Sequence, residues 1–308
     1  MEEKIDVSFV MTVYNKEYYL PSVLKALLNQ TGLKNPEFIF VDDKSTDRSV
    51  EIIREMTENT KNVRIFADGT NKGISVRINQ GIMAASGEYT RMLDSDDIFP
   101  IDSTERMLSL ARKHNADMVY GNFIKTGRKP QALEHRLMED FNYKYNKDAI
   151  RTILSGRFTR MGQLIRTSVL QKSGGADERV FIQDESIPLR SGLLADGIIK
   201  MEANVVLVPE EIGNASGNKS QLNFDRFMAY YYALKDNQGS LPKDVEEKMY
   251  KRALSAHWKQ VKRTAKIPYL EDTFFKYINN KLFGGTDYAF LEKMKTEFLK
   301  LDNVRKMR

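Results

Sequence analysis

The chain has 308 residues, of which 41% are hydrophobic and 29% are charged, a balance typical of globular rather than disordered proteins. It contains no cysteine, which excludes a disulfide framework, a thiolate zinc site and a cysteine nucleophile. The net charge is +6, but residues 216–308 carry +8 and the remainder carries −2. Such a basic surface can meet nucleic acid, anionic lipid or an acidic polymer, or it can be a solvated helical face.

The N-terminal segment and the hydropathy pattern bear on location. Acidic residues stand near the start, where a signal peptide would carry basic ones. No stretch approaches the roughly 18 consecutive apolar residues that a membrane span requires. We therefore expect a cytoplasmic protein, with peripheral contact at the inner membrane face as an open alternative.

The first 124 residues alternate strand-like and helix-like segments. Strands are predicted at residues 5–14, 37–43, 63–68, 88–97 and 116–124. Helices are predicted between them, at residues 19–31, about 46–56, 75–86 and 103–114. This alternation predicts an α/β fold with a mostly parallel sheet flanked by helices.

The second half is less regular. Residues 125–145 are polar and predict a loop or flap, followed by a short strand at 162–167, a helix at 184–195 and a strand at 199–209. Residues 211–221 predict a mobile loop, and the helical stretches beyond it lie near 224–235, 243–266, 269–282 and 288–301. We divide the chain into a catalytic domain, residues 1–215, and a C-terminal helical region, residues 216–308.

Polar clusters follow three of the predicted strands, at residues 12–15, 42–45 and 94–97. Ligands bind at the carboxyl ends of strands in such sheets, so these clusters are expected to converge on one crevice. Asp94, Asp96 and Asp97 would repel one another unless something neutralised them. Oxygen ligands of this kind suit Mg²⁺ or Mn²⁺ shared with a phosphate, and the alternative is a solvated acidic turn.

Two further residues favour nucleotide binding. Asp43 ends a buried strand and could accept hydrogen bonds from a base N–H or from ribose hydroxyls. Arg77 could reach phosphate as a planar fork, or it could be an ordinary surface arginine. No GxGxxG motif follows the first strand, which argues against a dehydrogenase.

Three segments carry a family resemblance: MTVYNKEYYLPSVLKALLNQT, FIFVDDKSTDRS and NKGISVRINQGIMAASGEYTRMLDSDD. In this order and spacing they resemble the family 2 glycosyltransferases of the GT-A fold. The resemblance implies an inverting, metal-dependent enzyme that uses Mn²⁺ or Mg²⁺. It would move a single sugar from a nucleotide-diphosphate sugar, most often a UDP-sugar, to a hydroxyl of a glycan or lipid-linked acceptor in cell-surface polysaccharide biosynthesis.

The resemblance also implies roles for individual residues. The nucleotide pocket would be lined by Thr12, Tyr14 and Glu17, with Asp43 at the base and Arg77 near the diphosphate or the base. The donor sugar or ribose would be held by Asp94 with Ser95, and the metal by Asp96 with Asp97 assisting.

The resemblance further implies a general base for the acceptor hydroxyl. The segment FIQDESIPLRSG offers Asp184, with Arg190 in the matching place for donor binding. Gln183 stands where relatives usually have Glu, so Glu185 is the alternative base. A helix N-terminus favours an ionised carboxylate, as a base requires, although Asp184 could merely cap the helix. Lys219, in the predicted loop, could touch phosphate when that loop closes over bound donor.

The C-terminal region has no catalytic motif. The chain has no QxxRW motif, which favours transfer of one sugar over polymerisation. The stretch 255–266 predicts either a basic surface helix that approaches anionic lipid, or a helix that packs Trp258 against the domain. A nucleotidyltransferase of related fold and a non-catalytic nucleotide-binding protein are the alternative functions. We expect no nucleic-acid partner and leave a homo-oligomer open.

Overall fold

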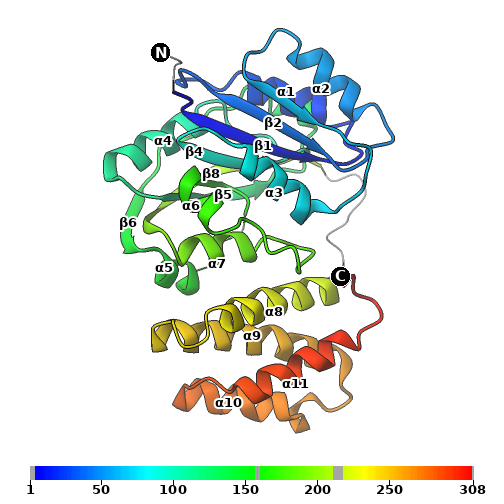
Figure 1. The fold of residues 1–308 in the computed structure, drawn as a ribbon, viewed down its shortest axis with the longest axis vertical. Coiled ribbons are helices and arrows are strands. Elements are labelled where there is room, and N and C mark those ends of the chain that lie inside the picture. Colours follow the sequence, from blue (N-terminus) through cyan, green and yellow to red (C-terminus); the bar gives the residue numbers. More distant parts are fainter. Residues whose placement is uncertain (1–3, 157, 159, 211–217, 307–308) are drawn as a thin grey trace.

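The computed structural model describes residues 4–156, 158, 160–210 and 218–306. Figure 1 shows two parts stacked along the long axis: a twisted sheet with helices on both faces, and a bundle of C-terminal helices. Among the described residues, no helix is long and apolar enough to cross a membrane.

An eight-stranded sheet with the order β3-β2-β1-β4-β7-β5-β8-β6 forms the centre of the first part. The strands are β1 (Val7–Val13), β2 (Glu37–Asp42), β3 (Val63–Phe66), β4 (Tyr89–Asp94), β5 (Met118–Lys125), β6 (Tyr143–Asp148), β7 (Gln163–Arg166) and β8 (Asp196–Val208). The first four strands run parallel, as do β5 and β8, whereas β7 and β6 pair antiparallel with their neighbours. The prediction of a mostly parallel α/β sheet is therefore confirmed.

In the part of the chain that the structure describes, seven helices connect these strands and four more form the C-terminal bundle. The connecting helices are α1 (Leu20–Leu28), α2 (Ser49–Thr57), α3 (Ile74–Ala84), α4 (Ser103–His114), α5 (Ala149–Ser155), α6 (Thr167–Lys172) and α7 (Ser186–Gly192), with a short 3₁₀ turn η1 (Pro130–Ala132). The bundle comprises α8 (Lys219–Asp236), α9 (Lys243–Thr264), α10 (Asp272–Phe283) and α11 (Tyr288–Leu299), with the 3₁₀ turn η2 (Pro268–Leu270) between α9 and α10.

The parallel half of the sheet forms because its strands are apolar on both faces. Every residue of β1 and β2 is buried, which is the pattern of a parallel strand covered by helices on each side. One face packs Phe9 and Met11 against α1, and the other packs Val10 against α3. Helix α3 approaches so closely at Gly81 that an added Cβ would lie 2.3 Å from Val10 Cγ1. This packing fixes the strand ends that carry the polar clusters.

The prediction for residues 125–145 is wrong in part, and two helices were not predicted. Strand β6 is an edge strand with charged residues and no buried position, so its apolar pattern is weak. Helices α5 and α6 have 7 and 6 residues, too few for a 3.6-residue period to become visible.

The C-terminal bundle has its own apolar core, which includes Phe227, Leu254 and Leu291. The same core contains Leu154 and Leu189, so the bundle packs against the α5 and α7 side of the first part. The proposed boundary at residue 215 lies outside the described residues, and the described part of the bundle begins with α8.

Asp225 of α8 ties the bundle to the chain that precedes α7. Its carboxylate accepts hydrogen bonds from the Phe181 backbone N–H at 3.0 Å and from Gln221 Nε2 at 2.7 Å. Only 1% of the residue is exposed, and burial raises its pKa from 3.8 to about 6. The folded state therefore binds this proton more tightly than the unfolded state, and that stabilisation is lost as pH rises through about 6.

We expect an Asp225→Asn variant to become more stable relative to the wild type by about 2 kcal/mol between pH 4.5 and pH 7.5. The asparagine side chain is neutral at both pH values, whereas the buried Asp225 carboxyl becomes charged as the pH rises. Urea unfolding of both proteins at the two pH values measures the change. An equal stability difference at both values would show that Asp225 does not titrate in this range.

Candidate functional site

The carboxyl ends of three adjacent strands form one polar edge of the sheet. In the parallel register, Thr12 of β1 lies beside Asp94 of β4, and Val13 lies beside Asp42 of β2. The three polar clusters thus lie side by side, as the strand order requires.

The loop after β1 is fastened to the loop after β2. The Asn15 backbone N–H donates to Ser45 Oγ at 3.0 Å, and Glu17 Oε2 accepts from the Arg48 backbone N–H at 3.0 Å. The Glu17 carboxylate is thus partly engaged with the protein. Tyr14, by contrast, leaves 51% of its surface exposed at this edge, where it can meet a ligand.

Arg77 braces Asp43 instead of facing solvent. Its side chain is fully buried, donates from Nε to Asp43 Oδ1 at 3.1 Å, and forks onto Asp68 at 2.6 and 3.0 Å. The carboxylate of Asp68, to which it is hydrogen-bonded, raises the pKa of Arg77 despite burial, and Asp43 raises it further. The backbone N–H groups of Lys72 and Gly73 also donate to Asp43.

This arrangement corrects the expected role of Arg77. The side chain lies beside Asp43, at the predicted base-binding position, but its donors are engaged by the protein, so it forms no fork toward phosphate. It is not an ordinary surface arginine either, because a fully buried guanidinium is stable only when it is paired with hydrogen-bond acceptors.

The three carboxylates at the end of β4 and just beyond it are each neutralised in a different way. Asp94 is paired with Arg160, and Asp96 accepts from Lys16 Nζ at 2.5 Å. Asp97 is only 4% exposed, and burial raises its pKa well above 3.8, with the charges of Asp94 and Asp96 adding to the effect. The segment is thus not a solvated acidic turn. The side chain of Asp96 is 37% exposed. Of the three carboxylates, it is therefore the one most accessible to a metal ion.

Arg160 links this segment to the candidate base. Its side chain is 4% exposed, donates to Asp94, and places Nε 3.8 Å from Asp184 Oδ1. Its Nε and Nη1 atoms have no hydrogen-bond partner among the described residues. Burial alone would lower the pKa of Arg160, but the carboxylates of Asp94 and Asp184 raise it above its ordinary value. One buried cation therefore holds two carboxylates that are 90 residues apart in sequence.

Asp184 and Glu185 differ sharply in their surroundings. Glu185 accepts from Arg226 Nε at 2.6 Å and from the Tyr230 hydroxyl at 3.2 Å, so α8 holds its carboxylate. Asp184 faces Arg160 and keeps 33% of its side chain exposed. Burial raises the pKa of Asp184, and Arg160 opposes that rise. The residue at the N-cap of α7 is Glu185, so Asp184 does not cap this helix.

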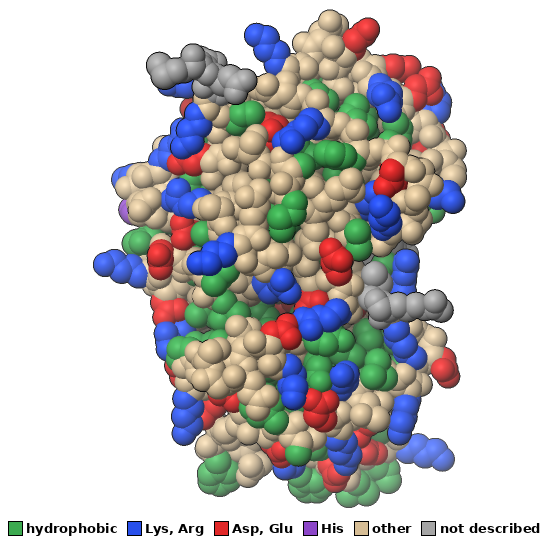
Figure 2. Space-filling view, in the orientation of Figure 1, with side chains coloured by type: hydrophobic (Ala, Val, Ile, Leu, Met, Phe, Trp, Pro, Cys, Tyr) green, Lys and Arg blue, Asp and Glu red, His purple; other side chains and the backbone are tan. Residues whose placement is uncertain are grey.

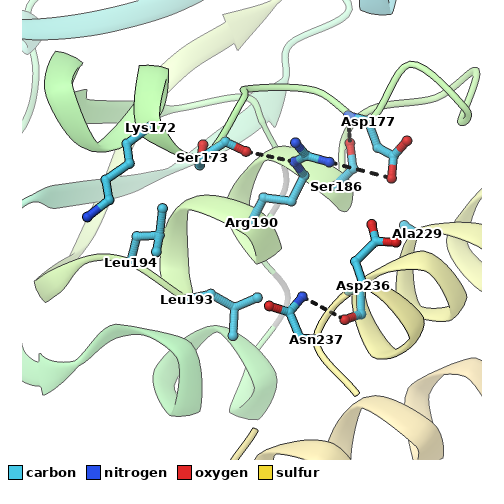
Figure 3. Close-up of a pocket in the computed structure, with 11 residues that line it drawn as sticks. Lys172, Ser173, Asp177, Ser186, Arg190, Leu193, Leu194, Ala229, Asp236 and Asn237 are labelled. Atoms are coloured by element: carbon cyan, nitrogen blue, oxygen red, sulfur yellow. Dashed lines mark hydrogen bonds and ion pairs between the residues drawn. The ribbon is translucent and has the colours of Figure 1, made fainter. Parts of the chain in front are cut away.

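Arg190 does not join these residues. It lines a cavity of about 190 Å³ between α7 and α8. Its Nε donates to the Ser173 carbonyl at 3.0 Å, and its Nη1 lies 3.7 Å from Asp177 Oδ2 (Figure 3). Asp236 of α8 lines the same cavity. The predicted donor-binding role of Arg190 is therefore replaced by contacts that fix the chain before α7.

Of two further predicted residues, one is buried and the other is exposed at the start of a helix. Ser95 is 3% exposed, so its hydroxyl lies below the surface of the polar edge. Lys219 is the first residue of α8, and most of the predicted donor-covering loop, residues 211–217, lies outside the described residues.

Arg160 and Lys16 are the site residues that the sequence did not reveal. Arg160 stands between α5 and β7 in a segment without a periodic pattern. Lys16 had a weak signal, because it follows β1 directly and so had to lie at the carboxyl edge of the sheet.

Comparison with known proteins agrees with this fold. The model of glycosyl transferase family 2 matches residues 8–174. An uncharacterized glycosyltransferase of Haemophilus influenzae is 38% identical over 117 residues, which are 38% of this chain and 46% of that protein. Glycosyltransferase GlyG of Streptococcus pneumoniae is 28% identical over 246 residues, which are 74% of this chain and 79% of GlyG. The minor teichoic acid biosynthesis protein GgaB of Bacillus subtilis is 33% identical over 114 residues, 37% of this chain and 13% of GgaB.

Solved structures share the fold. S. aureus TarS 1–349 in complex with UDP-GlcNAc has a TM-score of 0.65 and 17% identity, over 90% of this chain and 80% of that one. The mannosyltransferase PcManGT of Pyrobaculum calidifontis, in complex with GDP-Man and Mn²⁺, has a TM-score of 0.60 and 14% identity, over 97% of this chain and 88% of that one. At these identities the likeness concerns the fold alone.

Proposed function

This chain belongs to glycosyl transferase family 2, and from that membership we propose that it moves a single sugar from a UDP-sugar to a hydroxyl of a glycan or lipid-linked acceptor, with inversion at the anomeric carbon. That the chain is a glycosyltransferase follows from the family match, which removes the nucleotidyltransferase and the non-catalytic protein as alternatives. The donor, the acceptor and the stereochemistry belong to the proposal.

The observation that carries the proposal is the row of Asp94, Arg160 and Asp184. A candidate base and a candidate donor-binding carboxylate share one buried cation at the carboxyl edge of the sheet. A single displacement needs its base on the acceptor side of the donor, within hydrogen-bond reach of the attacking hydroxyl. The accessible third of Asp184 supports its choice as that base.

In this mechanism Asp184 takes the proton of the acceptor hydroxyl as the oxygen attacks the anomeric carbon, and the bond from that carbon to the diphosphate breaks in the same step. Arg160 stabilises the ionised form of Asp184 before the reaction, because a nearby guanidinium opposes protonation of a carboxylate. Glu185 has no comparable freedom, since Arg226 and Tyr230 already hold it.

Asp43 and Tyr14 would bind the nucleoside. Asp43 is held in place by Arg77 and by the backbone of Gly73, so its carboxylate is oriented before a ligand arrives. Fixing a polar group in advance reduces the free energy lost on binding. Tyr14 offers an exposed aromatic ring at the same edge.

The residues present fit a divalent metal shared with the donor. Within the described part of the chain, no three His, Asp or Glu side chains form a metal cluster, so the protein would supply few ligands. Mg²⁺ is commonly held by one or two carboxylates together with substrate phosphates. Asp96 is accessible for this purpose, while Asp97 is too buried, so we propose Asp96 alone as the protein ligand. Bound there, Mn²⁺ or Mg²⁺ would neutralise charge on the leaving diphosphate.

The pathway is proposed from the relatives. The chain spans 46% and 13% of two of the relatives it matches, one of which is a teichoic acid biosynthesis protein. Cell-surface polysaccharide biosynthesis is the role that this similarity favours, with a sugar hydroxyl as the acceptor.

We expect UDP-sugars with Mn²⁺ to raise the melting temperature of the protein more than GDP- or ADP-sugars do. A ligand that binds the native state at 100 times its Kd adds about 2.7 kcal/mol of stability, which a thermal-shift measurement resolves. Sugar transfer from the best donor, or its slow hydrolysis, is then measured from the UDP that is released. Stabilisation by another class of sugar nucleotide would correct the donor, and the absence of any stabilisation would overturn the proposed donor site.

A further inference from the structure

An exposed apolar surface lies at the end of the molecule opposite the sheet. We define the α10 patch as seven side chains on η2, on α10 and on the residue that precedes η2: Ile267, Tyr269, Leu270, Phe275, Ile278, Leu282 and Phe283. They are seven of the sixteen exposed large hydrophobic residues in the described chain, within 17 residues of sequence. Figure 2 shows hydrophobic side chains along the lower rim, at the end where Figure 1 places α10.

Helix α10 has an outward apolar face in addition to Phe274 and Tyr277, which pack on Trp258. Phe275, Ile278 and Leu282 follow one another at spacings of three and four residues and therefore share one helical face, which is exposed. The buried positions of the helix are the polar residues Thr273 and Asn280. The apolar face of a helix in a globular protein ordinarily packs on the core, so an exposed apolar face of this kind marks an interaction surface.

The core beneath the patch is supplied by other residues. Trp258 of α9 is buried and packs its ring against Tyr269, Phe274 and Tyr277, at centroid distances of 5.9, 5.4 and 6.4 Å. Trp258 is therefore packed, as one of the two alternatives predicted, but these contacts lie within the C-terminal bundle. Tyr269 belongs to both the patch and this cluster, but Phe275, Leu282 and Phe283 are not among the rings that pack on Trp258 and can be changed without removing those contacts.

Basic residues border the patch. Lys262, Arg263 and Lys266 stand at the end of α9 and just beyond it, and Lys281 lies within α10. Residues 262–283 contain five basic and two acidic side chains; Lys276 is paired with Asp287, and Asp272 is paired with Lys293. The surroundings of the patch are therefore positive.

We propose that the α10 patch docks on an anionic lipid bilayer. Aromatic and aliphatic side chains flanked by Lys and Arg are the composition that inserts at a bilayer interface, with the charged groups held by anionic headgroups. A second copy of the chain fits less well, because two like-charged rims would then face each other. Docking would bring the proposed enzyme to a lipid-linked acceptor; this last step rests on the proposed function, whereas lipid binding does not.

Vesicle sedimentation of the full chain tests the proposal. We expect binding to vesicles of phosphatidylcholine mixed with phosphatidylglycerol, and little binding to phosphatidylcholine alone. Binding should weaken at least about tenfold in the triple variant Phe275→Ser, Leu282→Ser, Phe283→Ser, which removes apolar insertion. A second variant with glutamine at Lys262, Arg263, Lys266 and Lys281 should lose a similar factor and most of the salt dependence.

The control replaces Met83 and Leu137 by serine, because these are exposed apolar residues outside the bundle. It should bind vesicles as the wild type does, and thermal unfolding should confirm that all variants fold. Equal binding by the triple variant and the wild type would overturn the proposal. The proposal would also be overturned if light scattering without lipid showed a dimer of the wild type and a monomer of the triple variant. Failure of the donor measurements would leave this result unchanged, so the two proposals fail separately.

Discussion

An Asp184→Asn variant is expected to lose sugar transfer by about 10²–10⁴-fold in kcat, while its affinity for the nucleotide sugar stays near that of the wild type. The amide is isosteric but cannot take the acceptor's proton. Arg160 would still be held by Asp94, so the buried guanidinium keeps one carboxylate partner. Steady-state kinetics together with donor binding in the absence of acceptor separate these two effects.

The matched control is Glu185→Gln, one residue away. Glutamine keeps one oxygen acceptor, which can serve Arg226, and loses the acceptor for the Tyr230 hydroxyl. We therefore expect the kcat of this variant to fall by no more than a few-fold, with a modest loss of stability. If Glu185→Gln lost activity while Asp184→Asn kept it, Glu185 would be the base. The pH profile adds a check: because burial raises the pKa of Asp184, wild-type activity should fall on the acidic side at a pH above 3.8.

The sequence predicted the parallel half of the fold well because one physical cause acts there. Strands that are buried on both faces are mostly apolar, and the turns that end them are polar, so β1, β2 and β4 were visible as runs in spite of the buried Glu37 and Arg91. Edge strand β6 and the short helices α5 and α6 lack such a signature. Their positions depend on neighbours that only the folded chain supplies.

The pairings within the site were not predictable for a related reason. Lys16 and Asp96 are 80 residues apart, and Arg160 and Asp94 are 66 apart, so no local spacing rule joins them. Arg77 was misjudged because arginine is ordinarily exposed. Its burial follows from two carboxylates, at positions 43 and 68, that only the fold brings to it.

The second large effect is expected at the metal position. An Asp96→Ala variant should lose the metal-dependent part of nucleotide binding and reduce kcat by on the order of 10³-fold, since several kcal/mol of charge stabilisation depend on that ligand. In this structure Lys16 Nζ neutralises Asp96 at 2.5 Å. In EDTA, where Lys16 stays paired with Asp96, donor binding to the wild type should therefore be weak. In Mn²⁺ it should be stronger.

Titration of UDP into both proteins, with Mn²⁺ and with EDTA, measures this difference without any turnover. Asp96→Ala should bind UDP equally in the two buffers, and its affinity should lie near the EDTA value of the wild type. Glu51→Ala is the control, because it removes an exposed, ion-paired carboxylate from α2 and should keep the full response to Mn²⁺. If wild-type binding and transfer were indifferent to EDTA, Asp96 would have no metal to hold. Its pairing with Lys16 would then be the permanent state of the site, with the lysine as the cation nearest the diphosphate.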